Sequence, residues 1–426
     1  MKRERAQPGE SDAKRTAPDA RPDGDLEVPF SHVREKLRDV LEREGVAIVT
    51  DVIEGGELRE MEQAFVSDLA ALVDDDALRA CDDPRVQQAY DRYKSDGLRA
   101  FPHATARQIQ RIPGFVLQGC VAAGHFAWSV RRHPRVHAAF AALFPEDAGP
   151  LVSSIDVTFF EPEGGPAHDV YDGSAHADQN GNDTRAPNLG DCSVYQGILY
   201  VWPAGDGCTT TCVWPGSHRS VWPRMMADAS FVASGTRGDH YCEVKELQDA
   251  TLREELLAGW CAHSRKLTIP AGALLLWNSR TVHTGWKGGP RFAQAVCLEP
   301  ARERPAAQRL AKLRLAALGL PSTHWARIGH QHDVLPSYTG WLEATPAASA
   351  CGHDEPSEVV LPLRAAIRPA ALAEGADLGA LSALAQIDWT DRAQCTHHCV
   401  WQPPEDDKER AALLEASVRE EFKPFL

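Results

Sequence analysis

The stretch that decides the fold runs from residue 272 to residue 291 and reads GALLLWNSRTVHTGWKGGPR. Two short runs in it, 273–277 and 281–285, are rich in apolar and β-branched residues and are separated by a polar turn. Runs of this length between turn residues predict β-strands. Arg291 opens a further run directly after Gly-Gly-Pro. The stretch therefore predicts three consecutive strands joined by tight turns.

The same alternation of short strands and turns extends along the chain before and after this stretch. The candidate strands are 151–160, 175–180, 193–202, 209–214, 265–269, 273–277, 281–285 and 291–298. Short strands gathered in one block predict a mainly β fold, either a barrel or a jelly roll. A helix at 247–260 indicates an insertion between the fourth and the fifth strand.

Helical spacing of apolar residues predicts further helices around the barrel. They are expected at 33–41, 57–73, 125–144 with a break at Pro134, 306–318, 377–385 and 408–419, and a strand is expected at 46–49. The charged first residues cannot bury enough apolar surface to fold. We expect a disordered leader at 1–29, a barrel domain with helical insertions at 30–300, and a C-terminal helical extension at 301–426 that packs on the same domain.

The composition excludes several classes of protein. The 426 residues are 43% hydrophobic and 25% charged, as in globular proteins, and the formal net charge is −15. A nucleic-acid or anionic membrane partner would need a basic face, so neither is expected. Eleven cysteines, an odd number, and the lack of a long apolar run predict a cytoplasmic protein with reduced thiols. The oligomeric state is left open.

A histidine and an aspartate two residues apart form the first candidate site. Alternate residues of a strand point to the same face, so His176 and Asp178 would project together from strand 175–180. From the spacing alone, a metal site and a surface ion pair are equally good explanations. His283, late in the same block of strands, would supply a third ligand. Two imidazoles and one carboxylate leave three positions of an octahedral metal open, which suits Fe(II).

A second pair of the same spacing, His353 and Glu355, is the competing match. It lies in a polar stretch that contains proline and has no strand periodicity, and no later histidine falls in a predicted strand. We interpret this pair as part of a solvated loop.

The order of motifs around the candidate ligands resembles the phytanoyl-CoA dioxygenase family. The residues that carry the resemblance are His176-Ala177-Asp178-Gln179, the turn Trp214-Pro215-Gly216-Ser217-His218, and the stretch 272–283 followed by Arg291. It covers about residues 31–300. The resemblance implies a double-stranded β-helix, a cupin-like barrel, with iron on His176, Asp178 and His283.

The resemblance also implies a reaction. Members of the family use 2-oxoglutarate as co-substrate with dioxygen, so the chain is expected to hydroxylate a small organic substrate and to release succinate and carbon dioxide. Halogenating relatives lack the carboxylate ligand that Asp178 supplies here, which favours hydroxylation. Two other classes remain open: a cupin-like metalloprotein that uses zinc or manganese, and a barrel that binds a ligand without catalysis.

Arg291 is the candidate anchor for the co-substrate, because it stands where the family places an arginine and a guanidinium binds a carboxylate through two hydrogen bonds. The residues on its face, Ala293, Ala295 and Cys297, are small and leave room for a ligand. Arg280 competes but has the opposite strand parity to His283.

A hydroxyl group near the arginine is also expected. Relatives often place a hydroxyl residue two positions after the second histidine, where this chain has Gly285. Tyr200, Thr211 or Thr281 would replace it, and the sequence does not choose among them.

Three other features have a plainer interpretation. The turn with Ser217 and His218 is interpreted as structural, since no acid partner for a nucleophilic serine is indicated. The pair Cys395 and Cys399 is interpreted as a loop, because zinc requires a second separated pair of ligands. Residues 179–183 are either substrate contacts or turn residues, with equal support.

Overall fold

The computed structural model describes residues 23–112, 114–116, 118–144, 149–154, 156–165, 170–171, 175–182, 194–234, 242–300 and 359–363. The leader up to residue 22 and the helices expected at 306–318, 377–385 and 408–419 lie outside these residues.

The predicted start of the folded domain, residue 30, is wrong. Strand β1 (Glu27–Pro29) pairs in parallel with β2 (Val46–Thr50), and Leu26 and Val28 are fully buried. A strand of three residues is too short to show an alternation of apolar and polar residues, and the surrounding segment is charged. This strand therefore had no indication in the sequence.

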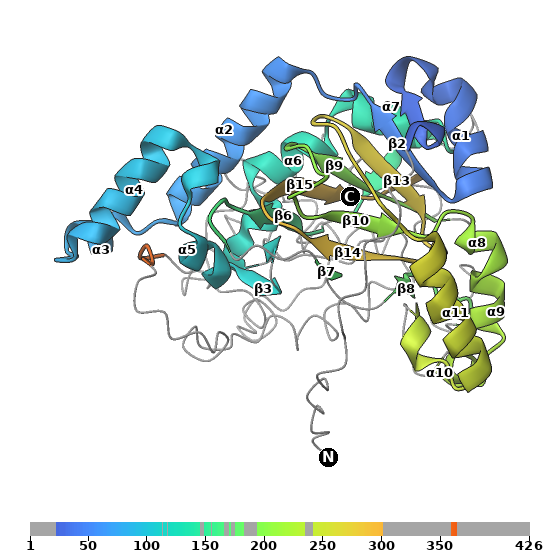
Figure 1. The fold of residues 1–426 in the computed structure, drawn as a ribbon. Helices are drawn as coiled ribbons and strands as arrows, with labels where there is room; N and C mark the ends of the chain where they lie inside the picture. Colours follow the sequence, from blue (N-terminus) through green and yellow to red (C-terminus); the bar gives the residue numbers. More distant parts are fainter. Residues whose placement is uncertain are drawn as a thin grey trace, which may run out of the picture.

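Two sheets form the centre of the molecule (Figure 1). The larger has the strand order β1-β2-β13-β9-β15-β6-β4-β3. The smaller has the order β11-β8-β14-β10-β12, and β7 also pairs with β14. Beyond β1 and β2, the larger sheet consists of β13 (Leu274–Asn278), β9 (Tyr195–Tyr200), β15 (Arg291–Val296), β6 (Thr158–Glu161), β4 (Phe115–Val116) and β3 (Gln110–Ile112). The smaller consists of β11 (Cys242–Glu243), β8 (His176–Ala177), β14 (His283–Lys287), β10 (Thr210–Val213), β12 (Arg265–Lys266) and β7 (Val170–Tyr171).

The chain passes back and forth between the two sheets. Strands β6, β9, β13 and β15 are neighbours in the larger sheet, whereas β8, β10, β12 and β14 are neighbours in the smaller. The pairings among them are antiparallel. Two antiparallel layers of four strands, wound in this order from one chain, form a double-stranded β-helix or jelly roll with extra strands at its edges. The predicted fold class is confirmed.

Two predicted strands are each divided in the structure. The run 151–160 forms β5 (Leu151–Ser153) and β6, and the run 291–298 forms β15 and the start of β16 (Leu298–Pro300). β5 and β16 pair with each other outside the two main sheets. The polar residues Ser154 and Asp156 accept hydrogen bonds from Cys297 N and Val157 N, which interrupts the ladder where the sequence predicted one continuous strand.

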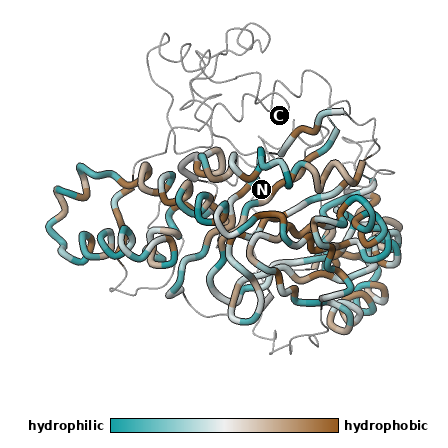
Figure 2. The backbone as a smooth tube through the Cα atoms, turned by 90° about the horizontal axis from the view of Figure 1, so that it is seen from above, coloured by the Kyte–Doolittle hydropathy of each residue, from teal (hydrophilic) through white to brown (hydrophobic). Residues whose placement is uncertain are grey.

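Apolar side chains from both sheets fill the interior of the barrel. Val213 of the smaller sheet and Leu267, which follows β12, lie in one buried cluster. The larger sheet contributes Ile198, Leu275 and Ala293 to the same cluster. Hydrophobic stretches accordingly run along the central strands, and hydrophilic ones gather on outer helices (Figure 2).

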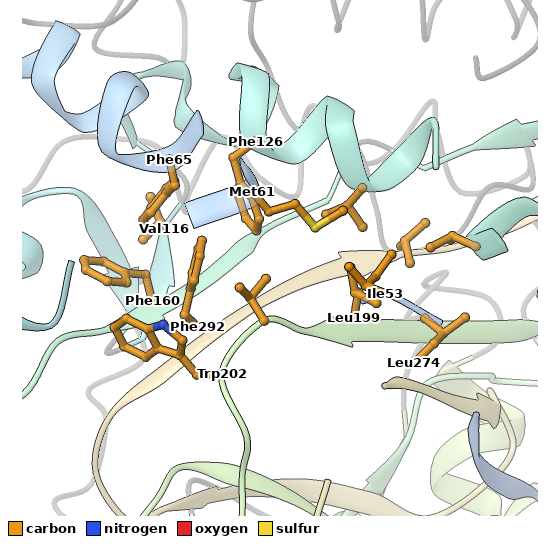
Figure 3. Close-up of a cluster of buried hydrophobic side chains, with 14 of the residues drawn as sticks. Ile53, Met61, Phe65, Val116, Phe126, Phe160, Leu199, Trp202, Leu274 and Phe292 are labelled. Carbon is orange, nitrogen blue, oxygen red and sulfur yellow. The ribbon is translucent and has the colours of Figure 1, made fainter. Parts of the chain in front are cut away.

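Helices α1 (Val33–Glu44), α2 (Gly55–Leu72), α6 (His125–Arg131) and α7 (Pro134–Ala141) contribute to a second core against the outer face of the larger sheet. In Figure 3 Phe65 of α2 and Phe126 of α6 approach Phe292 of β15, at ring-centroid distances of 4.8 and 4.5 Å. The helix expected at 125–144 is broken before Pro134, as predicted, since proline cannot donate the hydrogen bond that a continuous helix needs.

The insertion between β10 and β12 covers the smaller sheet. It contains α8 (Ser217–Ser220), α9 (Trp222–Met226), α10 (Ala229–Ser234) and α11 (Ala250–His263), which gather beside β8 in Figure 1. Trp260 of α11 and Met225 of α9 share a buried cluster with Trp286 of β14. The even-numbered face of β14, which carries Trp286, is therefore directed toward the helices of the insertion, and the odd-numbered face points the other way.

The segment that the sequence left unassigned, 74–114, is largely helical. It contains α3 (Asp75–Arg79), α4 (Pro84–Asp96) and α5 (His103–Gln108). Residues 359–363 of the predicted C-terminal extension pack against it, because Leu361 is fully buried and its N–H donates to Thr105 Oγ1 at 2.9 Å. The short 3-10 helices are Asp23–Asp25, Phe30–His32, Leu98–Ala100, Gln118–Ala123 and Val244–Glu246.

Candidate metal centre

Three side chains of metal-ligand type meet at one end of the smaller sheet. One ligand atom from each of His176, Asp178 and His283 lies within 4.8 Å of the other two. Asp178 Oδ2 is 3.2 Å from His283 Nε2, and Asp178 Oδ1 is 3.6 Å from His176 Nε2. The structure thus brings together all three residues that the sequence selected as metal ligands.

Strand pairing explains this meeting. His176 in β8 stands directly opposite His283 in β14, so the two imidazoles lie side by side with centroids 4.5 Å apart. Asp178 lies one residue beyond the end of β8, and its N–H donates to the Ser279 carbonyl at 2.9 Å. The turn before β14 therefore places the carboxylate, rather than a continuous strand as the sequence predicted.

Two further groups orient the candidate ligands. The Gln196 side-chain amide donates to Asp178 Oδ2 at 3.0 Å from strand β9. His283 Nδ1 lies 3.0 Å from the Thr281 carbonyl, a contact that holds the ring with Nε2 turned toward Asp178. Gln196 was not predicted as a functional residue from the sequence. The indication in the sequence was a polar glutamine on the inward face of a strand, β9, where its neighbours on that face are apolar.

The electrostatics of the centre favour a cation. Burial by itself lowers the pKa of His283, but the charge of Asp178, its hydrogen bond and the Thr281 carbonyl outweigh burial and raise that pKa above 6.5. Asp178 is only 7% exposed, so water screens its charge poorly. A divalent cation would meet the same negative potential that favours the protonated imidazole.

The donor set fits a metal ion that prefers nitrogen and oxygen ligands. Two imidazole nitrogens and one carboxylate within mutual reach make a three-ligand site that leaves other coordination positions open. The described jelly-roll barrel therefore carries at one end a set of donors that could hold a metal ion.

Arg291 opens β15 and is directed into the barrel. Its side chain is 6% exposed, its Cζ lies 3.9 Å from the centroid of the Phe159 ring, and Nη2 donates to the Tyr200 hydroxyl at 2.9 Å. Among the described residues, Arg291 Nε has no hydrogen-bond partner although it is buried. Ala293 and Ala295 lie in the inner cluster on the same face, as predicted. The guanidinium thus has a donor left for a further acceptor.

The three candidate hydroxyl residues separate in the structure. Tyr200 contacts Arg291, and Thr211 lies 3.0 Å from the Tyr200 hydroxyl. The Thr281 hydroxyl instead donates to the Gly45 carbonyl at 2.8 Å and joins the turn before β14 to the end of α1. Tyr200 is therefore the hydroxyl placed at the arginine, with Thr211 behind it.

One face of strand β9 connects the metal centre with the arginine. Gln196 and Tyr200 are four residues apart on the same face, at a separation of about 13 Å along the strand. Gln196 contacts Asp178, and Tyr200 contacts Arg291. The candidate ligands and the candidate anchor thus lie at two ends of one barrel interior.

Arg280 points elsewhere. It lies in the turn between β13 and β14, and its Cζ stacks over the Trp222 ring of α9 at 4.5 Å. Arg280 is separated from Arg291 as predicted, but the physical reason differs from strand parity, because Arg280 lies in a turn and not in a strand.

The Pro-Gly-Ser-His turn has a structural role. Ser217 Oγ accepts the Val282 N–H at 2.8 Å, and His218 Nε2 lies 3.0 Å from the Glu42 carbonyl. Burial lowers the pKa of His218, which favours a neutral ring. Both side chains are used in holding the insertion to β14 and to α1.

The polar side chains after Asp178 form hydrogen bonds with neighbouring groups of the protein. Gln179 is fully buried and accepts a hydrogen bond from the Ser279 hydroxyl at 2.7 Å, and Asn180 Oδ1 accepts the Asn182 N–H. These contacts favour the turn interpretation. Asp183, His353, Glu355, Cys395 and Cys399 lie outside the described residues.

Comparisons with known proteins give remote similarities. No family model matches the chain, and no curated protein matches it. Solved structures that resemble it include the epimerase SnoN in complex with Fe3+, alpha ketoglutarate and nogalamycin RO, at 14% identity over 64% of this chain and 85% of that chain, with a TM-score of 0.36. EctD from S. alaskensis with 2-oxoglutarate and 5-hydroxyectoine is 13% identical over 62% and 74%, with a TM-score of 0.34. A hypothetical protein from Escherichia coli is 13% identical over 72% and 80%, with a TM-score of 0.41.

Within the part of the chain that the structure describes, no helix combines the length and the apolar character needed to cross a membrane. None of the six cysteines described there takes part in a disulfide, and Cys212, Cys242 and Cys297 are buried.

Proposed function

We propose that the chain is an Fe(II)- and 2-oxoglutarate-dependent dioxygenase, similar to the phytanoyl-CoA dioxygenase family, that hydroxylates a small organic substrate. The observation that carries the proposal is the pairing of two sites in one barrel. An open centre of two imidazoles and one carboxylate lies at one end, and a buried arginine with an unused donor lies toward the other.

His176, Asp178 and His283 would hold the iron, and Gln196 would keep the carboxylate in position. When bound, Fe(II) with 2-oxoglutarate and dioxygen supplies oxidation of a substrate C–H bond, with succinate and carbon dioxide as the other products. Arg291, supported by Tyr200, would bind the distal carboxylate of the co-substrate and so orient the oxo acid.

The apolar lining of the barrel keeps water away from the reacting groups. Trp277 lies beside His283 at a centroid distance of 5.3 Å, and Ile198 and Leu275 belong to the same buried cluster. A dry site strengthens the charge interactions that hold an anionic co-substrate. We further propose that the protein is cytoplasmic, as its odd number of cysteines predicts.

The test is turnover with metal exchange. Purified protein reconstituted anaerobically with Fe(II) is expected to form succinate from 2-oxoglutarate and to consume oxygen. His176→Ala, Asp178→Ala and His283→Ala should each abolish this turnover while the far-ultraviolet circular dichroism stays unchanged. Activity with Zn(II) or Mn(II) but without oxygen uptake would favour a cupin-like metalloprotein instead.

Arg291 and Arg280 provide a matched pair for the co-substrate site. We expect Arg291→Ala to raise the apparent KM for 2-oxoglutarate by roughly a hundredfold, because it removes a charge-assisted contact from a buried pocket. Arg280→Ala should change that constant by less than about threefold, since Arg280 stacks on Trp222 outside the pocket. Titrations of 2-oxoglutarate under saturating iron measure both, and the reverse result would assign the anchor to Arg280.

A further inference from the structure

A buried indole N–H without a partner lies beside the candidate metal centre. Trp277 of β13 is 5% exposed, and its ring centroid is 5.3 Å from that of His283. Within the described part of the chain, Trp277 Nε1 is buried and has no hydrogen-bond partner. An indole nitrogen can only donate, and buried donors in folded proteins are nearly always paired. This N–H therefore indicates an acceptor other than the described groups of the protein.

Trp277 belongs to the inward face of β13. Leu275 lies with it in the cluster inside the barrel, whereas Leu274 and Leu276 belong to the core on the outer face of the larger sheet. Alternate residues of a strand point to the same side, so the indole is directed toward the barrel interior together with Leu275.

Strand pairing places Trp277 at the metal end of that interior. It stands directly opposite Gln196 of β9, whose side-chain amide donates to Asp178 Oδ2 at 3.0 Å. Arg291 contacts Tyr200, which lies further along the same face of β9. Residues opposite each other on paired strands share a face and lie close together. The unpaired donor and the guanidinium are therefore at different ends of the site.

A bound 2-oxo acid would bring acceptors to both ends. With its distal carboxylate at Arg291, its other end, a keto group next to a carboxylate, is directed to the metal centre. A hydrogen bond to an ionised acceptor is stronger than one between neutral groups, and more so in surroundings from which water is excluded. The carboxylate at the metal end is thus the acceptor best suited to the indole of Trp277.

We propose that Trp277 is a binding residue for the metal-side end of the 2-oxo acid, with its indole N–H donated to the carboxylate next to the keto group. The proposal rests on the proposed function, since it concerns the same co-substrate. It gives Trp277 an effect that is independent of the distal group of the oxo acid, whereas the effect of Arg291 depends on that group.

The test compares two oxo acids of equal chain length, 2-oxoglutarate and 2-oxopentanoate, which lacks the distal carboxylate. Isothermal titration calorimetry on the full chain loaded with Mn(II) measures binding without turnover. Trp277→Phe keeps an aromatic ring in the barrel but removes the donor, so we expect it to weaken the binding of both acids by about tenfold. Arg291→Ala should weaken 2-oxoglutarate binding much more than 2-oxopentanoate binding.

Trp202→Phe is the control, because Trp202 belongs to the core on the outer face of the sheet and its indole already donates to Glu62. It should leave both dissociation constants unchanged. The Mn(II) affinity should be unchanged in both tryptophan variants, since neither residue is a candidate metal ligand. Thermal unfolding checks that each variant keeps its fold, and Trp277→Leu takes the place of the phenylalanine variant should that one be unstable.

A second measurement observes the donor itself. In protein loaded with Zn(II) and labelled at the indole nitrogens, the Trp277 resonance is identified by its loss in the Trp277 variant. Its proton should move downfield when 2-oxoglutarate binds, because a hydrogen bond to a carboxylate deshields it. An unmoved resonance would overturn the role of Trp277, and so would a loss of affinity for 2-oxoglutarate alone or for neither acid. Absence of 2-oxoglutarate binding in the unmodified protein would instead overturn the proposed function.

Discussion

Asp178, whose carboxylate contacts three neighbouring side chains, is the central residue of the candidate metal centre. Asp178 faces both candidate histidines, and one of its oxygens accepts the amide of Gln196. Groups that hold a metal ligand in place commonly affect metal affinity, since they limit the orientations that the ligand samples before binding. Gln196, which contacts no other candidate ligand in the described part of the chain, is the residue where this effect can be measured.

Gln196→Leu is expected to weaken metal binding by at least about tenfold while keeping the volume of the side chain. The physical reason is that Asp178 Oδ2 loses the amide donor that Gln196 supplies and can turn away from the histidines. Titration with Zn(II) measures the dissociation constant. Gln87→Leu, on the exposed surface of α4, serves as control. An unchanged dissociation constant for Gln196→Leu would show that the histidines alone hold the carboxylate in place.

At the scale of elements, the buried carboxylate of Asp228 joins two segments of the insertion. Asp228 precedes α10 and accepts hydrogen bonds from Ser230 N, Gln248 N and Asp249 N at 2.9 to 3.1 Å. Asp249 in turn caps the start of α11. Burial raises the pKa of Asp228, but the hydrogen bonds from Ser230, Asp249 and Gln248 outweigh it and lower that pKa from 3.8 to about 2. The ionised form is therefore the one that joins α10 to α11.

Asp228→Asn should lower the free energy of unfolding by about 2 kcal/mol at pH 7, because the folded state loses its preference for the ionised group. The pKa of Asp228 is lowered in the folded state, so its contribution is complete above pH 3.8 and is lost as the pH falls toward 2. Urea unfolding at pH 7, 4 and 3 measures the difference between variant and parent. That difference should shrink at pH 3, and the exposed Asp39→Asn should show none. A difference independent of pH would mean that the charge is not responsible.

At the scale of the whole molecule, a segment far along the chain completes the core. Leu361 belongs to the cluster that includes α2, α4 and α5 residues, and Asp74 N donates to the Pro362 carbonyl at 2.9 Å. Val73 and Leu363 form an isolated antiparallel bridge. More than fifty residues separate this segment from the end of β16, so its place in the core could not be read from local pattern.

Leu361→Ala is expected to reduce the free energy of unfolding by about 3 kcal/mol, since it removes buried methyl groups and leaves a cavity. Val360→Ala is the matched neighbour, because Val360 is exposed and should change stability by less than about 0.5 kcal/mol. Denaturant unfolding at constant pH compares both with the parent chain. Equal small effects would show that residues 359–363 are not part of the cooperative unit.

Local patterns in the sequence predicted the barrel strands, the helices at 33–41, 57–73 and 125–144, and the pair His176 and Asp178, whereas residues 74–114 stayed unassigned. These depend on local patterns: alternation of apolar residues, helical spacing, and a histidine and an aspartate two residues apart. Parity on β15 also placed Arg291 on the same face as Ala293 and Ala295, because the geometry of a strand is set by its own backbone.

The tertiary structure alone decided which hydroxyl stands beside Arg291 and which residues support the ligands. Tyr200 rather than Thr281 meets the guanidinium, because β9 and β15 are neighbours while the Thr281 turn packs on Gly45. Gln196 reaches Asp178 because strands distant in sequence are brought together in the barrel. Such contacts depend on strand order and on the packing of turns, which no local pattern of residues specifies.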